Sequence, residues 1–166
     1  MSEVAQNIDL LTGAWNRERF EAEFARVVSD AQRRRLPLAL VRFDVDNLQE
    51  LNDVHGEDRM DGCLAWLAER ISAVVDGRGP ISRIGGDDFA VYLSDSSLED
   101  ALRVAERIRR SVPTTLHASA FGDFRLTISV GVAVNRRGEP WGNLLDAAEA
   151  ACVRAKQGGR DSVVSR

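Results

Sequence analysis

One short stretch, Ile81–Leu93, restricts the possible folds more than any other part of the chain. It contains two β-prone runs, Ile81–Ile84 and Phe89–Leu93, on either side of Gly-Gly-Asp-Asp at residues 85–88. Paired glycines supply the positive φ that a two-residue hairpin turn needs, so the stretch predicts a β-hairpin. Two interpretations of the tip remain open: a solvated polar turn, or glycines that leave room for a ligand beside carboxylates that hold a hard cation.

A second stretch favours the cation. Leu38–Phe43 is mostly apolar and leads directly into Asp44-Val45-Asp46. Acidic residues at the end of a buried strand place oxygen ligands on rigid backbone, which suits Mg²⁺. A strand-end aspartate and a hairpin-tip aspartate pair together predict a nucleotide–Mg²⁺ site. We expect Asp44, with the Val45 carbonyl beside it, and Asp87 to be the metal ligands.

The rest of the chain predicts alternating helices and strands. Asn16 is a suitable N-cap for a helix running to about Arg34, and Ser97 for a helix over Leu98–Arg110. The remaining expected elements are helices over Leu48–Val54, Asp61–Val75 and Leu144–Gln157, a hairpin of Thr115–Phe121 with Phe124–Ala133, and a short strand over Ser162–Val164. This order predicts a palm-like α+β fold, with a mostly antiparallel sheet of about five strands flanked by helices.

Five motifs, in order, give the chain a family resemblance. They are DLLTGAWNR at residues 9–17, FDVDNLQELNDVHG at 43–56, GGDDF at 85–89, TISVGVA at 127–133 and AKQGGR at 155–160. From about Asp9 to Val164 the chain resembles GGDEF domains, the diguanylate cyclase family. The expected organisation is a lead over residues 1–8 and a single GGDEF-like domain over residues 9–166.

The resemblance implies an enzyme that condenses two GTP molecules into cyclic di-GMP, with release of pyrophosphate, across a homodimer of half-sites. It also implies Mg²⁺ or Mn²⁺ as cofactor, and a sensory domain or protein partner that brings two copies together. The residues that the resemblance assigns to the chemistry are Asp44, Asp87 and Asp88, those assigned to the metal are Asp44, Val45 and Asp87, and those assigned to substrate are Asn52, Asp61, Gly85, Gly86, Lys156 and Arg160.

The chemistry of these residue types agrees with guanine and phosphate. Asp61 can accept hydrogen bonds from guanine N1–H and the 2-amino group, whereas adenine offers an acceptor at N1 and lacks that amino group. Lys156 and Arg160 are four residues apart near a helix end, from which both could reach one anion.

Several positions depart from the family pattern. Asp88 replaces the glutamate of the signature and shortens the side chain by one methylene, about 1.5 Å. Gln49 replaces a phosphate-binding lysine, and Met60 replaces a glycine, where its side chain either crowds the base or lies outward. The window of the family's product-inhibition motif, R-x-x-D, is Asp76–Gly79 and has neither residue in place, so we expect no tight product feedback there.

Composition limits the other possibilities. The net charge is −4, which disfavours nonspecific nucleic-acid binding, because that requires a basic surface. No apolar run approaches the roughly 20 residues that span a membrane, and the N-terminus does not resemble a signal peptide. Cys63 and Cys152 fall in expected helices, so we expect reduced, buried thiols and a cytoplasmic protein.

Three functions remain open at this stage. The first is an active diguanylate cyclase. The second, favoured by Gln49, Met60 and Asp88, is a degenerate domain that binds GTP or a dinucleotide and regulates a partner. The third is a purely structural interaction domain, which the retained site residues favour least.

Overall fold

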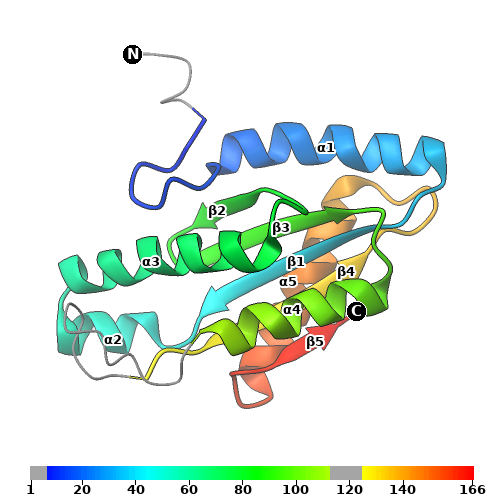
Figure 1. Ribbon diagram of the computed structural model, residues 1–166. Helices are drawn as coiled ribbons and strands as arrows, with labels where there is room; N and C mark the ends of the chain where they lie inside the picture. The colour runs from blue at the N-terminus through cyan, green and yellow to red at the C-terminus, as the bar shows by residue number, and fades with distance from the viewer. Residues whose placement is uncertain (1–6, 113–124) are drawn as a thin grey trace.

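The computed structural model of the protein describes residues 7–112 and 125–166. Five helices and five strands are described, and the helices flank both faces of one sheet in an α+β arrangement (Figure 1). In chain order they are α1 (Arg17–Arg34), β1 (Leu38–Val45), α2 (Leu48–His55), α3 (Glu57–Val75), β2 (Ile81–Gly85), β3 (Asp88–Ser94), α4 (Leu98–Ser111), β4 (Ile128–Val134), α5 (Trp141–Gln157) and β5 (Val163–Ser165).

The sheet has the strand order β2-β3-β1-β4-β5. The pairs β2–β3, β3–β1 and β1–β4 are antiparallel, and only β4–β5 is parallel. The prediction of a mostly antiparallel, five-stranded sheet flanked by helices is therefore confirmed. The carboxyl end of the central strand, β1, lies beside the tip of the β2–β3 hairpin.

Alternate residues of the strands build two cores. Odd-numbered residues of β1, such as Val41 and Phe43, face α3 and α4. Leu38 and Leu40 face α1 and α5 on the opposite side. Because side chains alternate along a strand, Arg42 and Asp44 belong to the α1/α5 face.

Both expected N-caps are present. The Asn16 side chain accepts a hydrogen bond from Arg19 N, and Ser97 forms a capping box with Asp100. Two helices begin earlier than expected: α3 at Glu57 instead of Asp61, and α5 at Trp141 instead of Leu144. Gly56 alone separates α2 from α3, since its φ of 87° turns the chain without a longer loop.

Other expectations need correction or fall outside the description. The positive φ expected of Gly85 and Gly86 is wrong: neither adopts it, and the turn residues are Gly86 and Asp87. The expected strand Thr115–Phe121 lies outside the described residues. The other strand expected in that hairpin, Phe124–Ala133, is seen in part as β4 over Ile128–Val134, which lies between β1 and β5. The final strand is Val163–Ser165 instead of Ser162–Val164.

Both cysteines, Cys63 and Cys152, are buried and free, as predicted. No helix within residues 7–112 and 125–166 is long and apolar enough to cross a membrane.

Candidate active site

Asp44 and Asp87 meet where β1 ends beside the hairpin tip. Asp44 is the second-last residue of β1, and its cross-strand neighbours are Asp88 and Ser129. Asp87 is in the turn, and its carbonyl accepts a hydrogen bond from Val45 N at 3.3 Å. The third member is Lys156, in the last turn of α5, whose Nζ lies 2.5 Å from Asp44 Oδ1. Three distant segments therefore place two carboxylates and one ammonium together.

Burial dominates the electrostatics of Asp44. Desolvation raises the pKa of this carboxyl to about 7; Lys156 opposes the rise and the nearby Asp87 carboxylate adds to it. Desolvation also acts on Lys156, but the Asp44 carboxylate outweighs it and the pKa of the ammonium is raised. A buried carboxylate that is expensive to ionise is well suited to a cation, because a positive ion stabilises its charged form.

The donor set fits a magnesium ion that is shared with a phosphorylated ligand. Asp44 Oδ1 is buried from water, and its contact with the protein is the ion pair with the Lys156 ammonium described above. Within the described ranges no group of three or more acidic, histidine or cysteine side chains converges on one point. Mg²⁺ typically takes one or two carboxylates and completes its shell with phosphates and water. Asp44, Asp87 and the Val45 carbonyl match that need.

Asp88 makes different contacts from its neighbour Asp87. Arg42 Nε donates to both Asp88 oxygens, at 2.9 and 3.1 Å, and Arg42 Nη2 also binds Asp88 Oδ2. Burial raises the pKa of Asp88, and Arg42 opposes the rise. The short side chain thus ends on the guanidinium of Arg42 on β1, a partner for Asp88 that was not predicted from the sequence.

The other side of the hairpin tip is held by Arg83. Its Nε and Nη2 donate to the Gly86 carbonyl at 2.9 and 2.6 Å, and its Nη1 lies 3.2 Å from Asp9 Oδ1. An added Cβ on Gly85 or Gly86 would meet nothing within 4 Å. The exposed surface over the two glycines is therefore open, as a closely approaching ligand would require.

The expected base-binding residues are on α2 and α3. Asn52 is half-buried on α2, and Asp61 is exposed in the second turn of α3. Met60 is 1% exposed and belongs to the core beneath α3. Neither alternative stated for Met60 is correct, because the helix phase turns it inward. Gln49 is exposed on α2.

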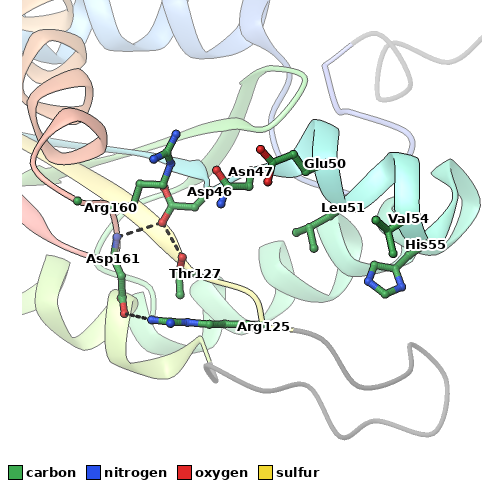
Figure 2. Close-up of a pocket in the computed structure, with 11 residues that line it drawn as sticks. Asp46, Asn47, Glu50, Leu51, Val54, His55, Arg125, Thr127, Arg160 and Asp161 are labelled. Carbon is green, nitrogen blue, oxygen red and sulfur yellow. Dashed lines mark hydrogen bonds and ion pairs between the residues drawn. The ribbon is translucent and has the colours of Figure 1, made fainter.

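Arg160 lies beyond the end of α5 at Gln157, where the chain turns through residues of positive φ, including Arg160 itself, and Arg160 N donates to Ala155 O at 3.0 Å. Arg160 borders a separate pocket of about 460 Å³ between α2 and the start of β4 (Figure 2). The geometry thus brings Asp44, Asp87 and Lys156 together and leaves Arg160 at a neighbouring pocket.

Asp46 is a structural residue that the sequence-based prediction did not single out. It is 3% exposed and accepts hydrogen bonds from Thr127 Oγ1 and Asp161 N, at 2.7 and 3.1 Å (Figure 2), and from Ser129 Oγ at 2.7 Å. These bonds join the end of β1 to β4 and to the loop that carries Arg160. The alternation Asp44-Val45-Asp46 was the available signal, since it puts both aspartates on one face.

The window of the product-inhibition motif has a second obstacle. Asp76 ends α3 in the left-handed conformation. A Cβ on Gly79 would lie 2.0 Å from the Tyr92 carbonyl oxygen, so β3 excludes any side chain at that position.

These features define a palm-like α+β domain with an acidic strand end that could hold a cation, and comparison with known proteins supplies the family. The model of the diguanylate cyclase GGDEF domain matches residues 6–162. The chain belongs to the GGDEF family.

Curated proteins are similar in sequence to nearly the whole of this chain. YhcK of Bacillus subtilis, an uncharacterized protein, is 35% identical over 95% of this chain and 45% of its own length. The response regulator PleD of Caulobacter vibrioides is 34% identical over 95% of this chain and 36% of its length. Diguanylate cyclase DosC of Escherichia coli is 33% identical over 94% and 34%. The chain thus spans between a third and a half of the length of these curated relatives.

Solved structures of GGDEF proteins are similar to this fold. The GGDEF domain of DgcB from Caulobacter crescentus, in complex with c-di-GMP, superposes with a TM-score of 0.93 at 27% identity, covering 99% of this chain and 96% of that one. Diguanylate cyclase SiaD from Pseudomonas aeruginosa, in complex with its activator SiaC, gives 0.92 at 32% identity, with coverage of 99% and 63%.

Proposed function

We propose that this domain is a diguanylate cyclase half-site, which binds one GTP with Mg²⁺ or Mn²⁺ and works as a homodimer to form cyclic di-GMP. The observation that carries the proposal is the desolvated Asp44 carboxylate at the end of β1, with the Asp87 carboxylate and the Lys156 ammonium beside it.

The charge around this pair supports a divalent cation. Four carboxylates and two cations form one connected group, which leaves an excess of two negative charges. The members are Asp44, Asp87, Asp88, Glu149, Arg42 and Lys156. An ion of charge +2 would balance the group.

The proposed reaction needs positioning more than covalent chemistry. The 3′-oxygen of one GTP attacks the α-phosphorus of the other; a P–O bond forms, the bond to pyrophosphate breaks, and the hydroxyl proton leaves. A second, reciprocal step closes the ring. When bound, Mg²⁺ supplies charge neutralisation at the phosphates.

The protein groups have separate tasks in this scheme. Asp44 and Asp87 hold the cation, and Lys156 lies where its ammonium can turn from Asp44 to a phosphate. The open surface over Gly85 and Gly86 admits the nucleotide to the backbone.

Asn52 and Asp61 are proposed to read guanine, and this is directly testable. Calorimetry in the presence of Mg²⁺ should give an affinity for GTP at least about tenfold higher than for ATP, because a site built on hydrogen bonds penalises a base that leaves them unmade. Asp61→Ser should narrow the difference. Equal affinities of the wild-type protein for both nucleotides would refute the guanine assignment.

A second candidate function has an observation of its own. Both oxygens of Asp88 are bound by Arg42, and Gln49 supplies no positive charge near a triphosphate. A domain that binds GTP or a dinucleotide, turns it over slowly or not at all, and regulates a protein partner would have these features. Product formation separates the two candidates.

A further inference from the structure

Arg42 is a half-buried cation that neither the sequence motifs nor the proposed chemistry uses. It lies on the central strand, two residues before Asp44, and its side chain is 12% exposed. We propose that Arg42 is a positioning residue: it ties the hairpin tip and α5 to β1, and so sets the distance between the metal-binding carboxylates of Asp44 and Asp87. This inference rests on the proposed function.

Arg42 of β1 contacts the hairpin through Asp88. Nε and Nη2 of Arg42 grip the carboxylate of Asp88, which is 18% exposed. A planar guanidinium that binds a carboxylate with two nitrogens fixes its orientation as well as its distance. Asp88 is the first residue of β3 and directly follows Asp87, so fixing Asp88 limits where Asp87 can point.

The tip is thereby held on both sides. Arg83 binds the carbonyl of Gly86, the residue before Asp87, and Arg42 binds the side chain of Asp88, the residue after it. The Asp87 carbonyl is also bound by Val45 N of β1, and the Asp87 carboxylate lies beside that of Asp44. The orientation of the Asp87 side chain towards Asp44 therefore depends on how firmly the residues on either side of it are held.

Arg42 also contacts α5, through Glu149. Arg42 Nη1 lies 3.0 Å from Glu149 Oε2, and Asp44 contacts Lys156. Glu149 and Lys156 are seven residues apart, so they lie on the same face of α5, two turns apart. Arg42 and Asp44 are two apart on one face of β1. The two ion pairs thus form parallel bridges from the strand to the helix.

The two bridges differ in strength. Glu149 is 55% exposed, and exposed ion pairs contribute little. The Arg42–Asp88 contact is mostly shielded from water and is the stronger restraint on geometry. We therefore expect the hairpin, more than α5, to move when Arg42 is changed.

The test compares metal affinity and turnover in Arg42→Met and Arg42→Lys. Methionine keeps the apolar stem without the fork; lysine keeps the charge without the fork. Mn²⁺ affinity is measured by EPR with a non-hydrolysable GTP analogue, and kcat and KM for GTP are measured at saturating Mg²⁺. A merely structural role would lower thermal stability without separating kcat from KM.

We expect Arg42→Met to weaken Mn²⁺ binding by about tenfold and to lower kcat by roughly 10- to 100-fold, the scale of a small misplacement of reacting groups. KM for GTP should change less than about threefold, because the base is read on α2 and α3. Arg42→Lys should recover part of both losses. Arg103→Met, which removes an arginine 61% exposed on α4, is the matched control and should match the wild type.

The possible results distinguish a failure of the positioning role of Arg42 from a failure of the proposed function. If the wild type binds Mn²⁺ and Arg42→Met binds it equally well with unchanged kcat, the proposed function stands and this inference is wrong. Faster turnover in Arg42→Met would also overturn it, because Arg42 would then be withholding Asp88. If Arg42→Met does not fold, Arg42→Lys decides in the same way. A wild type that neither binds Mn²⁺ nor forms product removes both.

Discussion

At the scale of single residues, Asp44 is the side chain on which the proposed chemistry depends most. Its carboxylate is desolvated, its Oδ1 is paired with the Lys156 ammonium, and its pKa is raised to about 7. Such a group costs free energy when it ionises without a cation, and regains it when a cation binds. Its neighbour Asp87 comes from the turn and completes the pair.

Asp44→Asn and Asp87→Asn should each abolish Mg²⁺-dependent GTP binding, because each removes a charged ligand while keeping the shape of the side chain. The measurement is calorimetry with Mg²⁺ and GTP. Thermal unfolding in the absence of metal serves as the control for folding and should show both variants folded. Full Mg²⁺-dependent binding in both variants would mean that the site is elsewhere.

Individual residues also show where sequence reasoning was limited. The pairing of Asp44 with Asp87 was predictable, because a strand end and a hairpin tip are recognisable in sequence. The pairing of Asp88 with Arg42 was not, since it requires the β1–β3 register, in which Arg42 lies opposite Ala90 and Asp44 opposite Asp88. Met60 required the phase of α3, which was predicted to begin four residues too late.

At the scale of elements, the seating of α5 on β4 depends on Gly131. A Cβ there would lie 2.1 Å from Ala148 O and 2.3 Å from Cys152 N. Both are backbone atoms of α5, so the helix could not yield by a rotamer change. The close approach brings α5, and with it Lys156, down onto the sheet.

Gly131→Ala should therefore destabilise the fold by several kcal/mol, on the order of other overpacked cores, and weaken Mg²⁺-dependent GTP binding. Gly142→Ala is the matched control, because it lies in α5, the helix that Gly131 packs against, and its added Cβ would meet nothing within 4 Å. That control should be neutral or stabilise by up to about 1 kcal/mol. Urea unfolding of both variants measures the difference, and equal stabilities would contradict the packing argument.

The α4 helix carries an acid-sensitive cluster. Arg109 and Arg110 bind Glu106 and lower its carboxyl pKa to about 2, against some desolvation. A carboxyl whose pKa is lowered on folding stabilises the fold above its unfolded pKa, near 4.5, and loses this contribution as pH falls towards 2.

Glu106→Gln should consequently lower the melting temperature at pH 7 and have a smaller effect near pH 2.5, where wild-type Glu106 is also becoming neutral. Melting curves at the two pH values measure this. A difference between wild type and variant that stays constant or grows on acidification would show that the ion pairs do not contribute.

The elements were largely predictable from sequence, and their ends were not. Caps identified the starts of α1 and α4, because Asn16 and Ser97 have a direct physical role there. The start of α3 was missed because Gly56 combines the end of one helix with the start of the next. The hairpin was correct, although its turn does not use the glycine conformations expected.

At the scale of the whole molecule, the proposed function gives this domain one half of a reaction that joins two identical nucleotides. In that proposal two GTP molecules must face each other, so catalysis would require two copies. The chain spans only part of the length of its curated relatives. Control by a sensory domain or protein partner therefore remains a proposal, and the domain itself can be tested by raising its concentration.

The most direct measurement is cyclic di-GMP formed from GTP and Mg²⁺ by the purified protein over a range of protein concentrations, with Asp87→Asn beside it. Proposed half-sites predict that product per protein rises with concentration until pairing is complete, and that the variant forms none. No cyclic di-GMP at any concentration, or equal amounts from the variant, would contradict the assignment of a diguanylate cyclase active site to Asp44 and Asp87.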